Sequence, residues 1–341
     1  MNTHAENLIR QKNLDAIRGA AKALKAATKP QLAAATGLST VTVNSLVAEL
    51  VANSELLEGD TIQPQLGRPA RVYTFNAEQH LSLLITLYEE NQIDMTEVHV
   101  CDMFGNGIYS DKHPMPFKME NTFDDDIGML VRRYPAIDVV GFGIPGVELN
   151  GMIATTSYPE LHSIDLAQHL QRVYQVGVFF ENDVNAATLG FCYSHPEYEE
   201  KDIVGLYFPM GRYPGAAIYT NHNIYKGANG LAGEIMHMPF CGNWAEFDYS
   251  EANITQYLQK TIQAISCLLN PDMVVIYTDT CVNELPPWDV LTFSYGGKGF
   301  DPPHMILPKI VFADSFQQDY LYGLSCSAIK RRTTLISQLT G

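Results

Sequence analysis

The chain has 341 residues, which is too long for one small core and predicts two or three domains. Its 46% hydrophobic content is typical of a soluble globular protein, and no apolar run approaches the roughly 20 residues of a membrane span. The first residues lack the apolar stretch of a signal peptide, and the six cysteines are scattered without a CxxC pair. We therefore expect a cytoplasmic protein with reduced thiols.

The formal net charge of −16 argues against nucleic-acid binding by the chain as a whole, because an acidic surface repels phosphate. The charge is unevenly placed, however. Residues 1–80 hold eight Lys or Arg and seven Asp or Glu, a net charge of +1, so the remainder carries −17. Any contact with DNA is therefore expected from residues 1–80.

These eighty residues have the spacing of a helix–turn–helix. A first helix is predicted by apolar residues at helical spacing, namely Leu14, Ile17, Ala21 and Leu24. A short helix beginning near Pro30, a turn at Gly37 and a second helix capped by Ser39 follow. The buried stripe of that helix is expected to be Val43, Leu46, Val47 and Leu50. We interpret residues 1–80 as a winged helix–turn–helix DNA-binding domain.

The second helix and the wing after it supply the candidate DNA contacts. The residues expected to face outward are short enough for the helix to enter a major groove: Thr40, Val41, Thr42, Asn44 and Ser45. The segment LLEGDTIQPQLGRPARVYTFN predicts two strands around a polar loop, with Arg68 and Arg71 placed to reach phosphates or a minor groove. A small helical domain used only for dimerisation is the alternative.

The rest of the chain alternates strand-like and helical patterns. A β-hairpin followed by βα alternation occurs twice, which predicts two related α/β lobes with a cleft between them. We expect the first lobe over residues 81–185, with a C-terminal helix at about 320–341 packing back onto it, and the second lobe over residues 186–319.

Five segments, in order, resemble the ROK family of repressors, open reading frames and sugar kinases, and within it the repressor branch. They are TGLSTVTVNSLVAEL with GRPA, GFGIPG, ENDVNAATLGF, GANGLAGEIMHM and LLNPDMVVIY. The resemblance implies an α/β, actin-like (ribonuclease-H-like) sugar-kinase fold of two lobes behind the winged helix–turn–helix. It also implies a homodimer or tetramer.

The resemblance also implies a sugar-binding pocket. Its residues in this sequence are Gly146, Asn182, Asp183, Glu234, His237 and Glu246. In family kinases the Asp of the ENDxN motif is the catalytic base, and Asp183 holds that position here. Asp183 is also well placed to cap the helix that begins near Val184, and His237 is equally compatible with a satisfied core histidine. The family's Asn after IPG is absent, and Ser157 and Tyr158 lie in that segment instead.

Two sites of the family are lost. The glycine-rich phosphate loop of the first hairpin is replaced by LYEENQID, in which Glu89 and Glu90 repel a triphosphate and no glycine allows close approach of the backbone. The zinc cluster is reduced to His237 and Cys241, so Cys241 is expected to be a small, partly buried hydrophobe. We therefore expect no catalysis, no metal and no cofactor.

The sequence thus predicts a DNA-binding transcriptional regulator, a repressor, whose kinase-like domain senses a sugar or sugar derivative. Its expected partners are a double-stranded DNA operator, the sugar effector and further copies of the chain, with no membrane. An active ATP-dependent sugar kinase with a DNA-binding appendage is one alternative. A DNA-binding scaffold that responds to no ligand is the other.

Overall fold

The structure, a computed structural model, describes residues 3–63, 69–90, 93–115, 121–149, 152–156, 158, 161, 164–285 and 308–339. The chain divides into two compact units. The smaller unit comprises residues 1–81 together with 102–104, and the larger comprises residues 82–101 and 105–341. Each unit is described separately below.

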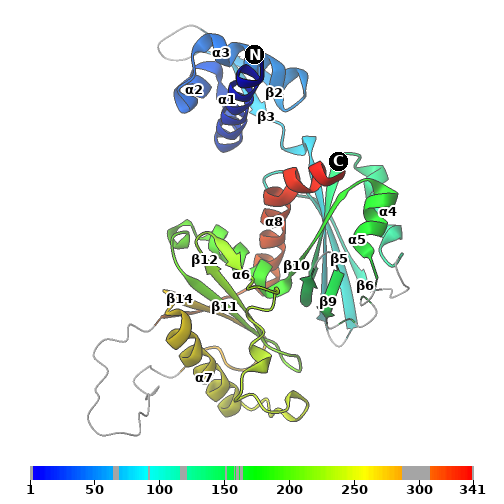
Figure 1. Ribbon diagram of the computed structural model, residues 1–341, viewed down its shortest axis with the longest axis vertical. Coiled ribbons are helices and arrows are strands. Elements are labelled where there is room, and N and C mark those ends of the chain that lie inside the picture. Colours follow the sequence, from blue (N-terminus) through cyan, green and yellow to red (C-terminus); the bar gives the residue numbers. More distant parts are fainter. Residues whose placement is uncertain are drawn as a thin grey trace, which may run out of the picture. The chain divides into compact units, whose positions relative to one another are not determined.

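The smaller unit, which we call the winged-helix unit, has three helices and a three-stranded sheet (Figure 1). The helices are α1 (Thr3–Leu24), α2 (Lys29–Thr36) and α3 (Thr40–Ala52). The strands β1 (Ala26–Thr28), β2 (Leu56–Ile62) and β3 (Ala70–Phe75) pair antiparallel in the order β1-β3-β2. A 3-10 turn, η1 (Ala77–Gln79), follows.

Local chemistry explains the turn between α2 and α3. Gly37 ends α2 with a φ of 70°, a left-handed conformation that glycine adopts without strain. The Ser39 hydroxyl then accepts a hydrogen bond from the Thr42 N–H (3.2 Å) and caps α3. Both predicted signals are confirmed.

The predicted stripes form the core of this unit, with one exception. Leu14, Ile17 and Ala21 of α1 are buried, and so are the four residues of the α3 stripe, Val43, Leu46, Val47 and Leu50. Leu24, which has the same helical spacing, is 46% exposed. It is the last residue of α1, where the helix ends and the chain turns at Lys25 with a φ of 60°.

The first sheet of the larger unit has the strand order β10-β7-β4-β5-β6. Strands β4 (Leu81–Glu90), β5 (Ile93–Cys101) and β6 (Gly107–Pro114) form an antiparallel meander. On its other side, β10 (Gly177–Asn182) pairs parallel with β7 (Ile137–Ile144). The unit also contains α4 (Asp124–Arg133), α5 (Leu166–Tyr174) and a small hairpin of β8 (Gly146–Leu149) and β9 (Met152–Thr156).

The second sheet repeats this topology, with the order β13-β12-β11-β14-β15. Strands β11 (Ile203–Phe208), β12 (Gly215–Thr220) and β13 (Asn223–Tyr225) are antiparallel, and β14 (Met273–Thr278) and β15 (Lys309–Phe312) extend the sheet in parallel. A 3-10 turn, η3 (Pro196–Tyr198), precedes β11, and helix α7 (Glu251–Leu269) precedes β14. The repeated order confirms the prediction of two related α/β lobes.

Helices α6 (Asp183–Ser194) and α8 (Phe316–Leu339) lie side by side between the two sheets (Figure 1). Their apolar residues join side chains of both sheets in one core cluster. Gly190 and Gly323 lie where the helices cross, and a Cβ on either would overlap backbone atoms of the opposite helix. This close crossing ties the two lobes together.

Within the described residues, no single helix is long and apolar enough to cross a membrane. Helices α2 and α3 pass that test only as a pair bent by 114°.

Candidate functional site

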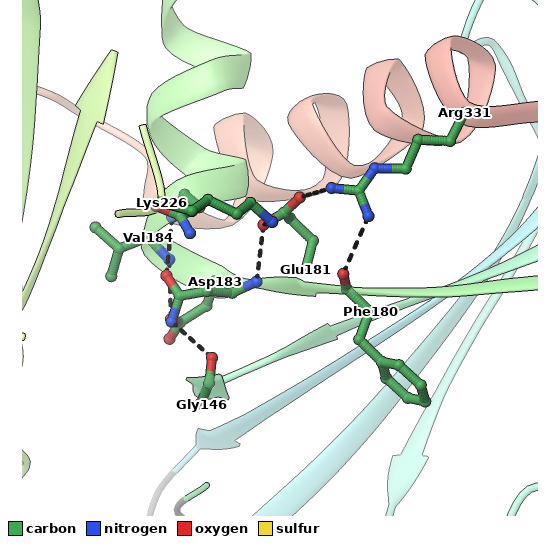
Figure 2. A network of polar contacts seen from close by, with 9 residues as sticks. Gly146, Phe180, Glu181, Asp183, Val184, Lys226 and Arg331 are labelled. Carbon is green, nitrogen blue, oxygen red and sulfur yellow. Dashed lines mark hydrogen bonds and ion pairs between the residues drawn. The ribbon is translucent and has the colours of Figure 1, made fainter. Parts of the chain in front are cut away.

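The ENDVN motif lies where the first sheet ends. Strand β10 finishes at Asn182, and its parallel partner β7 finishes at Ile144, so both carboxyl ends meet at one edge of the sheet. Gly146 follows β7 directly, and its carbonyl accepts a hydrogen bond from Asn182 Nδ2 at 3.1 Å (Figure 2). Two predicted pocket residues, far apart in the sequence, are thus in direct contact.

The helix cap at this edge is Asn182, not Asp183. Asn182 has the extended backbone of an N-cap (φ −65°, ψ 143°), and its Oδ1 accepts a hydrogen bond from Asn185 N–H at 3.0 Å. Asp183 is already the first residue of α6, and its Oδ1 accepts from the next residue, the Val184 N–H, at 2.8 Å. The predicted cap at Asp183 is therefore wrong by one residue, because the helix begins one residue earlier than expected.

Asp183 is a buried carboxyl group with 9% of its surface exposed. Burial raises the pKa of this carboxyl to about 7, because water no longer solvates the charged form. The Val184 N–H lowers the pKa, the Glu234 carboxylate raises it, and the Arg212 guanidinium lowers it again. Asp183 therefore titrates near neutral pH, which is characteristic of functional sites.

Glu234, whose charge acts on the Asp183 carboxyl, lies in the segment that follows β13. This segment runs along the edge of β12, where Ala216 N–H donates to Gly233 O at 2.8 Å. Gly233 has a φ of 100°, and a Cβ at this position would overlap Ala216 O, so only glycine allows the approach. Burial raises the pKa of the Glu234 carboxyl, and the neighbouring His237 lowers it.

The other two predicted pocket residues are exposed. His237 closes the 3-10 turn η4 (Ile235–His237) and is exposed, which excludes the alternative of a core histidine. Glu246 ends a second such turn, η5 (Trp244–Glu246), and is also exposed, so it does not join the buried group around Asp183. Cys241 is buried in the core of the second lobe, where its thiol contacts Ile235 O. Within the described part of the chain, no three His, Cys, Asp or Glu side chains form a group that could hold a metal ion.

A second buried carboxylate, Glu181, lies beside Asn182 and is 4% exposed. It receives Lys226 Nζ and Arg331 Nη2, each at 2.5 Å (Figure 2). Lys226 opens the segment that carries Glu234, and Arg331 lies on α8, where it also donates to Phe180 O at 3.3 Å. Glu181 thus joins three separate parts of the chain. The polar run of the motif was visible in the sequence, but these two cationic partners were not.

Arg212 is a site residue that the sequence analysis missed. It lies in the turn between β11 and β12, and its Nη2 contacts Glu89 Oε2 at 2.5 Å and Asp94 Oδ1 at 3.5 Å. These carboxylates flank the turn of the β4–β5 hairpin, the turn with LYEENQID. Tyr158, 2% exposed, also interacts with Arg212, and burial raises the pKa of this phenol. Arg212 was visible in PMGRYPGAAI as a charged residue among glycines. Ser157 lies outside the described residues.

The candidate DNA contacts on α3 divide into two groups. Thr40, Val41, Asn44 and Ser45 are exposed, with Val41 at 78%. Thr42 is half-buried, and its hydroxyl lies 2.9 Å from that of Ser39, so it serves the helix cap. Arg71 is exposed and forms an ion pair with Glu58. Arg68 lies outside the described residues.

The two lobes have the same strand order, and acidic residues lie where a strand of the first lobe meets a helix. This is the fold of a sugar kinase, and it follows a winged helix–turn–helix, a DNA-binding type of domain. Residues 94–247 match the model of the ROK family. The xylose repressor of Bacillus subtilis is 27% identical over 259 residues, which are 70% of this chain and 66% of that protein. The chain therefore spans about two thirds of the length of this relative. The xylose repressor of Bacillus spizizenii is 26% identical over the same shares.

Solved structures agree in fold. A ROK family transcriptional regulator, a homologue of the Escherichia coli MLC protein, superposes with a TM-score of 0.64 at 16% identity. The match covers 97% of this chain and 100% of that one. The ROK hexokinase of Thermus thermophilus matches with a TM-score of 0.55 at 17% identity, over 75% of this chain and 99% of the hexokinase. The chain is therefore similar to proteins of the ROK family, whose model matches residues 94–247.

Proposed function

We propose that this protein is a DNA-binding transcriptional repressor whose sugar-kinase-like unit senses a sugar or sugar derivative. The observation that carries the proposal is the winged-helix unit, in which a capped α3 exposes Thr40, Val41, Asn44 and Ser45 on one helix. Two relatives named xylose repressors, each matched over 70% of this chain, support the assignment.

The sensing part of the proposal rests on Asp183, Glu234 and Asn182. Burial raises the pKa of both Asp183 and Glu234. The charges of Glu234 and Arg212 act on Asp183, and His237 acts on Glu234. Carboxyl groups of this kind gain from hydroxyl donors, because a sugar hydroxyl replaces the lost water. We therefore propose that sugar hydroxyls bind at Asp183 and Glu234, with Gly146 and Asn182 shaping that edge. His237 and Glu246 are proposed to contribute only from the exposed rim.

We further propose that the protein is not a kinase. The turn of the β4–β5 hairpin carries Glu89 and Glu90, and Glu89 and Asp94 already share the guanidinium of Arg212. A nucleotide phosphate placed there would meet carboxylates instead of backbone N–H groups. A second copy of the chain is proposed as a partner, since winged-helix regulators read two half-sites about one DNA turn apart.

The test is selection of DNA duplexes from a random pool with the full chain, followed by fluorescence anisotropy on the enriched sequence. We expect a sequence with two related half-sites, weaker binding by Asn44→Ala, and release by one member of a panel of pentoses, hexoses and their derivatives. Lys201→Gln, which alters a surface residue of the larger unit, is the matched control.

Each alternative has its own outcome in this design. A pool without enrichment refutes DNA binding. An enriched duplex that no sugar releases, together with no thermal shift in the same panel, favours the ligand-independent scaffold. Turnover of ATP with any sugar of the panel, lost in Asp183→Asn, would establish the kinase instead.

A further inference from the structure

The turn end of the β4–β5 hairpin contacts Arg212, and at its other end the chain continues into the winged-helix unit. We propose that Arg212 is a positioning residue that holds this hairpin in place, and that the hairpin carries the state of the effector site to the DNA-binding unit. The proposal rests on the proposed function for its biological meaning, but its structural content is tested below without DNA or sugar.

At the first end, Glu89 and Asp94 are directly opposite each other in the register of the hairpin. Two like charges in that arrangement destabilise a strand pair unless a cation lies between them. Arg212 supplies this cation, with Nη2 at 2.5 Å from Glu89 Oε2 and 3.5 Å from Asp94 Oδ1. The pairing of the last residues of the hairpin thus depends on a side chain from the other lobe.

Arg212 is itself held by the second lobe. The Asp279 carboxylate accepts from Met210 N–H at 2.5 Å, and the Tyr249 hydroxyl donates to Arg212 O at 3.4 Å. The turn between β11 and β12 is therefore fixed on both sides of Gly211. The guanidinium is presented to the hairpin from a constrained backbone, so a shift of one lobe against the other moves it relative to Glu89 and Asp94.

Arg212 is also coupled to the proposed effector site. Its charge acts on the Asp183 carboxyl, and its guanidinium interacts with the buried Tyr158. A ligand that changes the charge or the hydrogen bonding of Asp183 therefore changes the electrostatic balance at Arg212.

The strands of the hairpin are paired without interruption from Glu90↔Ile93 to Ser82↔Cys101. Residues 102–104 follow directly, and they belong to the winged-helix unit. There, Phe104 packs against Phe75 with ring centroids 5.6 Å apart. Met103 N–H donates to Ala77 O at 3.0 Å.

Lys25 Nζ, directly after α1, lies 5.3 Å from the Phe104 ring centroid, and Phe75, the last residue of β3, packs against the same ring. The residues that follow β5 in the chain are therefore packed inside the winged-helix unit. Uninterrupted pairing along both strands resists internal deformation of the hairpin, which suits transmission of a small shift.

The test is hydrogen–deuterium exchange with mass spectrometry on the full chain. Arg212→Gln removes the cation and keeps a hydrogen-bonding side chain of similar length. We expect uptake to rise several-fold in peptides covering residues 83–101, and also in peptides covering residues 70–75 and 102–104. Arg212→Lys restores the charge and is expected to recover most of the protection. Lys201→Gln, which removes an exposed ion pair with Asp272 in the same lobe, is expected to leave both regions unchanged.

Faster exchange confined to residues 83–101 overturns the proposal, since the hairpin would then be held by Arg212 without passing the change on. Unchanged exchange in both regions overturns it as well. If Arg212→Gln fails to fold, the double variant Glu89→Gln with Asp94→Asn decides the question. It removes the repulsion that Arg212 neutralises, so in it the further change Arg212→Gln should no longer alter exchange. Because neither DNA nor sugar is present, these outcomes are independent of whether the proposed repressor function holds.

Discussion

Replacing Asp183 with Asn is expected to stabilise the larger unit at pH 8 and to leave its stability unchanged near pH 4. The side chain keeps its shape, and the Asn oxygen still accepts the Val184 N–H. What the change removes is the ionised carboxylate, which burial disfavours in the folded protein. The size of the effect follows from the pKa of this group.

A pKa near 7, against 3.8 for an ordinary aspartate, means that the folded protein holds a proton more tightly than the unfolded chain. Between these values the unfolded chain has lost the proton and the folded one has not, so stability falls as the pH rises. Each pKa unit corresponds to about 1.4 kcal/mol, which gives a loss of up to about 4 kcal/mol that is complete above pH 7. Asp183→Asn avoids this loss.

Urea unfolding followed by tryptophan fluorescence measures the effect, because Trp244 lies in the aromatic core of the second lobe. The stability difference between variant and wild type should grow between pH 4 and pH 7 and then stay constant. Asp272→Asn is the control of opposite sign, since the Asp202 N–H and Lys201 lower the pKa of Asp272. That variant should lose stability at neutral pH and none in acid. A pH-independent difference for Asp183→Asn would refute the reasoning.

Three further predictions concern the scaffold and the DNA contacts. Gly233→Ala should destabilise the larger unit by about 1–3 kcal/mol in the same urea assay, and more than Gly242→Ala, which has positive φ but no atom within 4 Å of a new Cβ. Asn44→Ala should change the base preference of the selected duplex, whereas Arg68→Ala should weaken all duplexes alike. Because several basic side chains of the winged-helix unit already pair with carboxylates or rings, we expect a shallow salt dependence, with a slope of about −2 per bound unit by anisotropy titration. A slope steeper than about −5 would contradict that account.

The sequence was sufficient for features that depend on local spacing. The cap at Ser39, the turn at Gly37 and the buried stripe of α3 all follow from residues within a few positions of each other. The two-lobed α/β fold was also predictable, because the same succession of strands and helices occurs twice. Leu24 shows the limit of periodicity, because it has the spacing of the buried residues but lies at the exposed end of α1.

The candidate site was predictable only in part. Its position at the end of a strand followed from ENDVN, but the contacts that define it join residues distant in the sequence. Arg212 meets Glu89 across 123 positions, and Arg331 meets Glu181 across 150. A local sequence pattern does not show that residues so far apart in the chain are in contact. The exposure of His237 and Glu246 could not be predicted from the sequence either, because it depends on how the chain folds back after Gly233.

In the ENDVN motif, Glu181 and Asn182 bind distant parts of the chain, whereas the Asp183 carboxylate binds the neighbouring N–H. Glu181 holds Lys226 and Arg331, while Asn182 caps α6 and holds Gly146 O. These bonds have a structural role, so the motif alone is weak support for catalysis. Asp183 differs, because its carboxylate accepts from the adjacent Val184 N–H and is buried at a cost in stability.

A residue that lowers stability and makes few structural contacts is a better functional candidate than its neighbours. The two kinds of role separate experimentally. Asn182→Ala should lower the urea midpoint of the larger unit, because it removes a helix cap and leaves the Gly146 carbonyl without its amide donor. Asp183→Asn should raise that midpoint at pH 8 and weaken the response to the effector. If both variants lowered stability alike, Asp183 would be structural too, and the sensing site would have to lie elsewhere.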